Sequence, residues 1–312
     1  MVIVPSAFIV ILELDLCLIL ILSSPSLLSI SIKWPDLDLY TLLSIEASSG
    51  KSFVAHEIAI ERNIPILSLD SMAVYKGLDI LSAKPTDVMR AQVEYLGIDI
   101  ADHDQNFSVV DYLNYLIDID FPKMTYDKDI LAVGGTGLYF SSMIKNFEFK
   151  PTDPTIRAEL EQLNYGQLLK FHEMYKIELP NVELNKRRLI RNIEASLLED
   201  SKYVFPKLNI KSDNVGIFWN NPDYKINIQK RTKNMIEDGL ADELKSLKNP
   251  SKTIMQAIGM NIDTDIESNI NQKTYKLAKK QITWFKKELS LVSHTTNDSN
   301  FIKEKMIELM HE

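Results

Sequence analysis

The feature that most constrains the fold is a short phosphate-binding motif between an apolar segment and a helical pattern. Residues 45–52 read I-E-A-S-S-G-K-S and match G-x-x-x-x-G-K-[ST] at every fixed position except the first, where Ile45 replaces glycine. Residues 40–44 are apolar enough for a buried strand, and residues 53–59 carry apolar side chains at helical spacing. In such a strand–loop–helix unit, backbone N–H groups and the lysine hold phosphate oxygens, and the hydroxyl faces Mg²⁺. The motif therefore predicts a ligand with a di- or triphosphate group.

Two further apolar segments, residues 65–69 and residues 129–133, are interpreted as buried strands. The first ends at Asp70, and the second runs into the turn G-G-T-G, which contains Thr136. Strands that alternate with helices indicate a parallel sheet flanked by helices, and ligands of such sheets bind beyond the carboxyl ends of the strands. We therefore expect an α/β fold of the P-loop NTPase type, in which the phosphate loop, Asp70 and Thr136 face one cleft.

Changes in composition and pattern divide the 312 residues into five segments. Residues 1–38 form an atypical apolar extension, and residues 39–150 form the first part of the α/β core. Residues 151–212 are helical and charged in pattern, which predicts a small helical insertion domain. Residues 213–292 return to the core and add basic helices, and residues 293–312 form a C-terminal tail.

The composition limits the location and the partners of the protein. A formal net charge of −8 gives the whole chain no attraction to nucleic acid, so RNA contacts must come from local basic clusters. The single cysteine, Cys17, excludes an internal disulfide framework and suits a reducing cytoplasm. The apolar run in residues 1–38 has no Lys or Arg before it and is broken by serines and Pro25. We expect a cytoplasmic protein without a stable membrane partner, and a weak membrane anchor in residues 1–38 remains the alternative.

The segment that begins at Asp70 narrows the class of enzyme. Residues 70–85 read D-S-M-A-V-Y-K-G-L-D-I-L-S-A-K-P. This resembles the D-S-x-x-x-Y-[KR]-x-[ML]-D-I-x-[ST]-A-K-P segment of the tRNA dimethylallyltransferases, also called tRNA isopentenyltransferases. The resemblance covers the chain from about Tyr40 to Leu289. Further blocks similar to that family follow in the same order at residues 107–112, 133–139, 188–194, 231–240 and 277–284.

The resemblance implies a reaction and a set of site residues. The protein would transfer a dimethylallyl group from dimethylallyl diphosphate to the exocyclic amine of the adenosine just 3′ of the tRNA anticodon. Asp70 would orient that amine and accept its hydrogen bond or proton, with Thr136 beside the reacting centre. Arg231 would be a cation that stabilises the leaving diphosphate. Mg²⁺ is the implied cofactor, and the hydroxyl of Ser52 would face it. The expected diphosphate site comprises Ser48, Ser49, Gly50, Lys51 and Ser52.

Three basic clusters in an otherwise acidic chain indicate contacts with a nucleic-acid backbone. They lie at residues 186–191, 225–233 and 273–287, and the last contains six lysines and no acid. By resemblance, the helical insertion would hold the anticodon stem-loop while the target base leaves its stack. For Gln281 and Trp284, a packing role is an equal alternative to RNA contact. The expected tRNA-binding residues are Arg188, Arg191, Lys279, Lys280, Gln281 and Trp284.

Three other interpretations remain open from the sequence. An adenylate-type isopentenyltransferase would prenylate a free nucleotide, although the basic helical insertion argues against it. A phosphate-loop kinase would transfer a phosphoryl group from ATP, which residues 70–80 do not suggest. A non-catalytic RNA-binding relative is motivated by Ile45 and Glu46. We expect the tRNA-modifying enzyme to be a monomer.

The phosphate loop departs from the family pattern at Ile45 and Glu46, because family members usually read G-P-T where this chain reads I-E-A. Isoleucine disfavours the positive φ that glycine permits, and a nearby carboxylate repels a diphosphate. Replacing both residues together, Ile45→Gly with Glu46→Pro, should therefore lower the KM for dimethylallyl diphosphate in steady-state assays. A KM that stays at the wild-type value or rises would contradict this weakening of the loop.

Overall fold

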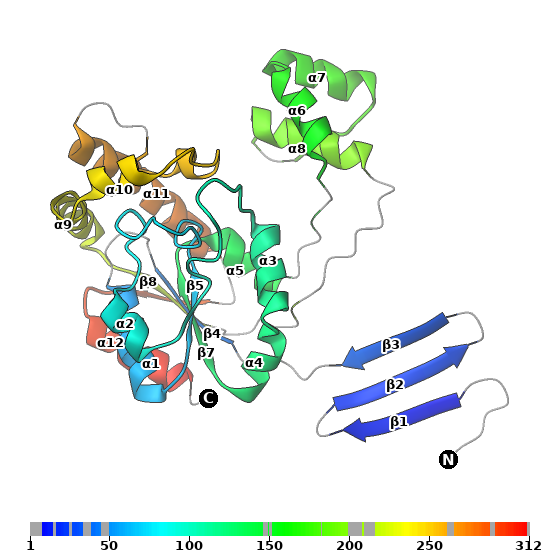
Figure 1. The fold of residues 1–312 in the computed structure, drawn as a ribbon, viewed down its shortest axis with the longest axis horizontal. Coiled ribbons are helices and arrows are strands. Elements are labelled where there is room, and N and C mark those ends of the chain that lie inside the picture. Colours follow the sequence, from blue (N-terminus) through cyan, green and yellow to red (C-terminus); the bar gives the residue numbers. More distant parts are fainter. Residues whose placement is uncertain are drawn as a thin grey trace. The chain divides into compact units, whose positions relative to one another are not determined.

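The computed structural model of this chain describes residues 8–14, 17–24, 27–33, 39–44, 50–145, 149, 152–181, 183–198, 208, 216–260, 265–287 and 291–310. The chain divides into two compact units. The smaller unit comprises residues 147–207, and the larger one comprises residues 1–146 and 208–312. Both are drawn in Figure 1.

A parallel sheet of six strands forms the centre of the larger unit, with the strand order β6-β5-β7-β4-β8-β9. The strands predicted at residues 40–44, 65–69 and 129–133 correspond to β4, β5 and β7. The predicted parallel α/β sheet is therefore confirmed. The six strands are β4 (Leu39–Ser44), β5 (Ile66–Leu69), β6 (Tyr95–Leu96), β7 (Ile130–Gly134), β8 (Gly216–Asn220) and β9 (Leu291–Thr295).

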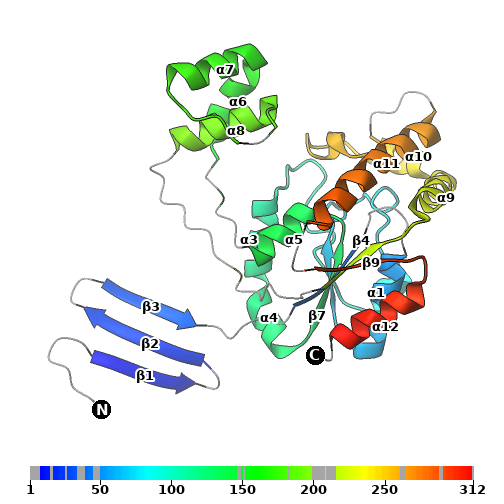
Figure 2. The same cartoon turned by 180° about the vertical axis from the view of Figure 1, so that it is seen from behind.

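Helices cover both faces of this sheet. In Figure 1 and Figure 2, α1 and α12 lie side by side on one face, while α3, α4 and α5 lie on the other. The helices of this unit are α1 (Lys51–Arg62), α2 (Asp87–Gln92), α3 (Val109–Asp118), α4 (Phe121–Asp127), α5 (Gly137–Ile144), α9 (Tyr224–Glu237), α10 (Leu240–Ser246), α11 (Ile266–Phe285) and α12 (Ser299–Leu309), with a 3₁₀ turn at Ile254–Gln256.

The core under α1 shows why the C-terminal residues belong to the sheet unit. Ile58 of α1 and Ile302 and Met306 of α12 are fully buried, and they pack with Val133 and Trp219 from the sheet. Residues 293–312, which we expected to form a tail, instead contain the end of β9 and the whole of α12. Burial of these apolar side chains stabilises the helix against α1, by about 1.5–3 kcal/mol for each large side chain that is fully buried.

Within the expected extension at residues 1–38, the described strands form a separate antiparallel sheet. These strands are β1 (Phe8–Leu14), β2 (Cys17–Ser24) and β3 (Leu27–Lys33). Among the described residues, none of the helices combines the length and the apolar character that a membrane crossing requires.

The smaller unit is helical and contains α6 (Pro154–Gln162), α7 (Tyr165–Met174) and α8 (Lys186–Leu197). Leucine and isoleucine side chains from the three helices form its core. The fully buried carboxylate of Glu194 accepts hydrogen bonds from the backbone N–H of Asp153, at 2.8 Å, and from Arg191, at 2.9 Å, and it also pairs with Arg157. This buried charge is thus paired, as a charge away from water must be.

The segment at residues 77–85, which we call the wall loop, is held by a cluster of ionic contacts. Nζ of the buried Lys84 donates to Asp79 Oδ1 at 2.8 Å, to Asp99 Oδ1 at 2.6 Å and to the Tyr75 carbonyl at 2.6 Å. Arg90 Nη1 donates to the second oxygen of Asp99 at 2.6 Å. Burial raises the pKa of Asp99, but the hydrogen bonds and charges of Lys84 and Arg90 outweigh it and hold the pKa below its ordinary value of 3.8.

The lowered pKa of Asp99 predicts a pH dependence of stability. The ionised carboxylate contributes to the free energy of unfolding above its ordinary pKa, and this contribution is lost as the pH falls through the lower pKa of the folded state. Asn is a suitable replacement because it tolerates the positive φ of 55° at this position. Asp99→Asn should lower the free energy of unfolding at pH 7, and its difference from wild type should shrink below about pH 4 in denaturant titrations. A difference that is constant from pH 7 to pH 3 would contradict the role of this ion pair.

The strands β5 and β7 approach each other closely at Gly134. A Cβ atom at this position would lie 2.3 Å from the Leu69 carbonyl oxygen. Gly134→Ala should therefore separate the two strand ends and lower the free energy of unfolding by about 1–3 kcal/mol. At Gly166 of α7 the nearest contact of an added Cβ would be an ordinary 3.5 Å, so Gly166→Ala is the matched control. Equal stabilities of the two variants would show that the close approach imposes no constraint.

Candidate active site

Two cavities lie at the carboxyl ends of β5 and β7. The loop cavity has a volume of about 320 Å³ and includes residues 50–52 in its wall. The helix cavity has a volume of about 490 Å³ and is lined largely by the turn after β7 and by α9 and α11. Asp70, Ser82 and Arg231 line both cavities. The two cavities therefore meet at these three residues.

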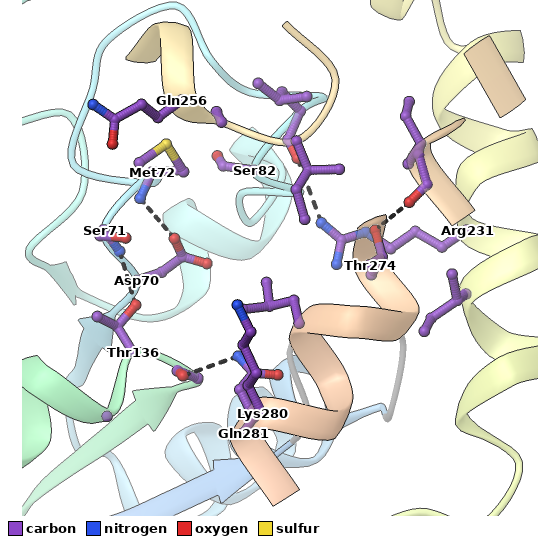
Figure 3. Close-up of a pocket in the computed structure, with 18 of the residues that line it drawn as sticks. Asp70, Ser71, Met72, Ser82, Thr136, Arg231, Gln256, Thr274, Lys280 and Gln281 are labelled. Atoms are coloured by element: carbon purple, nitrogen blue, oxygen red, sulfur yellow. Dashed lines mark hydrogen bonds between the residues drawn. The ribbon is translucent and has the colours of Figure 1, made fainter. Parts of the chain in front are cut away.

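Asp70 directly follows β5 and uses one carboxylate oxygen to shape the backbone. Its Oδ1 accepts hydrogen bonds from the backbone N–H groups of Met72, at 2.8 Å, and of Ala73, at 3.3 Å. These bonds hold the side chain in one orientation. Figure 3 shows the second oxygen turned toward the open space between Lys280 and Arg231. Asp70 thus presents a fixed acceptor where the two cavities meet.

Thr136 lies beside Asp70 because the turn after β7 is tied to β5. The Thr136 N–H donates to the Leu69 carbonyl at 3.1 Å, and its Oγ1 accepts from the Ser71 N–H at 3.2 Å. The buried Gln281 of α11 donates from Nε2 to the Gly135 carbonyl at 3.0 Å, as Figure 3 shows. These contacts bring together the turn, β5 and α11.

Trp284 of α11 packs against the start of α5. A Cβ at Gly137 would lie 2.6 Å from the ring of Trp284, so only glycine leaves room for this contact. Trp284 is 38% exposed and lines the helix cavity. Its ring packs edge to face against that of Phe285, with the ring centroids 4.9 Å apart. Gln281 and Trp284 therefore have packing roles at the cavity wall, and their contact with RNA stays a prediction.

Arg231 enters the site from α9 and is partly buried. Its Nη2 donates to the Leu81 carbonyl at 3.5 Å. A guanidinium in such a place attracts an anion more strongly than one in water, because the surrounding protein screens its charge less. Arg231 can therefore bind anionic groups in either cavity.

The described end of the phosphate loop opens into the loop cavity. Gly50 has a φ of 88°, in the left-handed region that glycine favours, and α1 begins at the next residue, Lys51. The N–H groups at the beginning of α1 thus lie at the wall of the cavity, where an anion is favoured. Residues 45–49, which include the predicted Ser48 and Ser49, lie outside the described residues. The structure brings the predicted residues Gly50, Lys51 and Ser52 into one cavity with Asp70 and Arg231.

The donors near the loop suit a magnesium ion that is shared with a diphosphate. Among the described residues, there is no group of three or more His, Cys, Asp or Glu side chains that could hold a metal. Mg²⁺ does not need such a cage, because it commonly takes one or two protein oxygens together with water and substrate phosphates. Ser52 supplies a hard hydroxyl oxygen in the wall of the loop cavity, so the residues present fit an ion whose other ligands are water and substrate phosphates.

Tyr95 also lines the loop cavity and is linked to α1. Burial raises its pKa to about 12, although the charge of Arg90 lowers it slightly. The hydroxyl therefore stays protonated at neutral pH. It is hydrogen-bonded to Nδ1 of His56 at 2.9 Å, and Nε2 of His56 is hydrogen-bonded to Oε1 of Gln92 at 3.1 Å. This chain of hydrogen bonds fixes the tyrosine ring against the cavity.

The predicted tRNA-binding residues fall into two sets. Arg188 and Arg191 belong to α8 of the smaller unit, where Arg188 is exposed and Arg191 pairs with the buried Glu194. Lys279 and Lys280 are exposed on α11 of the larger unit, and Lys280 lines the helix cavity. Of the four residues named here, Lys280 is the one that the described cavity walls include.

Sequence reasoning missed several residues of the site. Ser82 lines both cavities, and residues 256–258 line the helix cavity. Glu243 of α10 lies outside the described walls of both cavities but binds the backbone of the wall loop. Ser82 lay within the motif already recognised, but the sequence around Glu243 offered no pattern that indicates such a contact.

Comparisons with known proteins identify the family of this chain. The model of the IPP transferase family matches residues 73–288. A tRNA dimethylallyltransferase of Halothermothrix orenii is 31% identical over 288 residues, which covers 82% of this chain and 87% of that protein.

Solved structures confirm the predicted fold. The full-length tRNA isopentenylpyrophosphate transferase of Bacillus halodurans has a TM-score of 0.56 and 26% identity, and the match covers 88% of this chain and all of that one. A tRNA isopentenylpyrophosphate transferase of Staphylococcus epidermidis, at 24% identity and a TM-score of 0.60, supports the fold and covers 88% of this chain and 98% of that one. Together with the family match and the motifs around Asp70, these findings confirm the resemblance read from the sequence: the chain belongs to the IPP transferase family.

Proposed function

We propose that this protein is a tRNA dimethylallyltransferase, which moves a dimethylallyl group from dimethylallyl diphosphate to the exocyclic amine of an adenosine in tRNA. One observation carries the proposal. Asp70 lines both the cavity that contains the phosphate-loop residues and the cavity that contains Thr136. A donor carbon held in one cavity and a nucleophile held in the other can therefore meet beside Asp70.

The loop cavity suits the diphosphate of the donor. As the bond between C1 and the diphosphate oxygen breaks, negative charge grows on the leaving oxygens. Lys51, the N–H groups at the start of α1 and Arg231 lie around this cavity and stabilise that charge. Mg²⁺, held by the Ser52 hydroxyl and the diphosphate, would neutralise further charge on the leaving group.

The helix cavity suits the adenine. Its wall combines apolar side chains, among them Ile258 and Trp284, with the polar residues Thr136 and Asp70. The free oxygen of Asp70 accepts a hydrogen bond from the exocyclic amine and aims its nitrogen at C1. The new C–N bond forms as the C–O bond breaks, and the amine proton passes to the Asp70 carboxylate.

The proposal also covers which adenosine is modified and which residues bind the tRNA. We assign the adenosine just 3′ of the anticodon as the target, and a base can enter the cavity only after it leaves its stack. Lys279 and Lys280 beside the cavity, and Arg188 and Arg191 of the helical unit, would contact phosphates of the anticodon stem-loop. Action as a monomer is also part of this proposal.

The reaction is tested by the mass of the product. The protein is incubated with an anticodon stem-loop RNA, dimethylallyl diphosphate and Mg²⁺, and the RNA should gain the mass of one dimethylallyl group. A parallel reaction with AMP should give no product. Prenylated AMP with unmodified RNA would replace this proposal by the free-nucleotide enzyme, and RNA binding without any product would favour a non-catalytic RNA-binding protein.

Asp70→Asn tests the assigned role of the carboxylate. The amide oxygen can still accept the N–H groups of Met72 and Ala73, so the local fold is kept, but the amide cannot take the proton. We expect kcat to fall by roughly 10²–10⁴-fold with RNA affinity nearly unchanged. Asp118→Asn, an exposed change at the end of α3, is the control and should keep wild-type turnover. Wild-type turnover in Asp70→Asn would refute the role of Asp70.

A further inference from the structure

The wall loop, residues 77–85, separates the loop cavity from the helix cavity. Leu81 lines the helix cavity, and Ser82 lines both. The loop is neither helix nor strand, and its backbone has a positive φ at Gly77, 77°, and at Ala83, 49°. The N–H groups of such a segment need partners from elsewhere in the protein. The position of this loop decides the shape of the junction where the reaction is proposed to occur.

Glu243 supplies partners for three consecutive N–H groups of the wall loop. Its Oε2 accepts from Asp79 at 2.7 Å and from Ile80 at 2.6 Å, and its Oε1 accepts from Leu81 at 2.9 Å. Hydrogen bonds to an ionised carboxylate are about twice as strong as neutral ones. This side chain, 162 positions along the chain from Leu81, therefore fixes the backbone of the loop firmly.

Both backbone polar groups of Leu81 are hydrogen-bonded to side chains of two neighbouring helices, α9 and α10. Its N–H donates to Glu243 of α10, and its carbonyl accepts from Nη2 of Arg231 of α9 at 3.5 Å. The two helices are joined at Gly239, which has a φ of 98°. Glu243 and Arg231, which belong to one helix–turn–helix segment, thus both form hydrogen bonds with the backbone of Leu81.

The side chain of Leu81 adds a third constraint. It is 7% exposed, and a Cβ at Gly259 would lie 2.5 Å from its Cδ1. Leu81 can therefore hardly move without disturbing its neighbours. A shift of the Leu81 backbone would also move the carbonyl oxygen to which Arg231 donates.

We propose that Glu243 is a positioning residue that orients Arg231 toward the leaving diphosphate by holding the wall loop at Leu81. Within the described part of the chain, Glu243 lines neither cavity, so it acts through the loop and not on the reactants. The identity of the anion rests on the function proposed above. The coupling between Glu243, Leu81 and Arg231 rests on the contacts themselves.

Glu243→Gln is the first test, because the amide keeps the shape of the side chain but replaces one accepting oxygen with a donor. We expect the KM for dimethylallyl diphosphate to rise and kcat/KM to fall by about tenfold or more. Asp242→Asn is the matched control. Asp242 lies in the same first turn of α10, but its carboxylate pairs with Lys245 in solvent, so wild-type kinetics are expected. Wild-type kinetics in Glu243→Gln would overturn the proposal.

The double variant Glu243→Gln/Arg231→Lys distinguishes a positioning role of Glu243 from a general loss of structure. If Glu243 acts through Arg231, Glu243→Gln should reduce kcat/KM by less than about twofold once Arg231 is lysine. A full additional tenfold loss in that background would refute the coupling. Hydrogen exchange gives a direct second readout: amide exchange at residues 79–81 should become faster in Glu243→Gln and stay unchanged in Asp242→Asn.

Binding of inorganic diphosphate distinguishes failure of this inference from failure of the proposed function. Calorimetry with diphosphate and Mg²⁺ needs no tRNA and no turnover. If the wild-type protein prenylates no RNA, the proposed function fails, and the diphosphate affinity still decides the role of Glu243. An affinity about tenfold weaker in Glu243→Gln than in Asp242→Asn would support the inference, and equal affinities would overturn it.

Discussion

The close approach of β5 and β7 at their carboxyl ends is the constraint on which the active site depends. Gly134 leaves no room for a side chain against Leu69, and the Leu69 carbonyl accepts the N–H of Thr136 at 3.1 Å. The turn after β7 therefore lies directly beside Asp70. Backbone packing in the sheet therefore sets the distance between Asp70 and Thr136.

The charged groups of the site are placed by different parts of the fold. α1 begins at Lys51 after the left-handed turn at Gly50, and α9 carries Arg231 to the wall of the same cavity. The wall loop between the cavities is anchored by the buried Lys84 and by Glu243. Such fixed charges stabilise a leaving diphosphate without having to reorganise during the reaction.

The sequence predicted the sheet and the meeting of Asp70 with Thr136, because apolar runs that end in polar or glycine-rich residues mark buried parallel strands. It did not predict Glu243, because this carboxylate binds backbone N–H groups, which leave no pattern of residue types. It assigned Arg191 to tRNA, whereas that side chain also neutralises the buried Glu194. The packing of α12 on α1 was missed as well, since two apolar faces distant in sequence do not reveal that they are partners.

We propose that the two cavities hold the two substrates and meet at Asp70. The most direct test is a crystal structure with an anticodon stem-loop and an unreactive thio analogue of dimethylallyl diphosphate. We expect the diphosphate against Lys51 and Arg231 in the loop cavity, and the flipped adenine beside Thr136 with its amine about 3–3.5 Å from C1. Diphosphate bound in the helix cavity, or an adenine remote from Asp70, would contradict it.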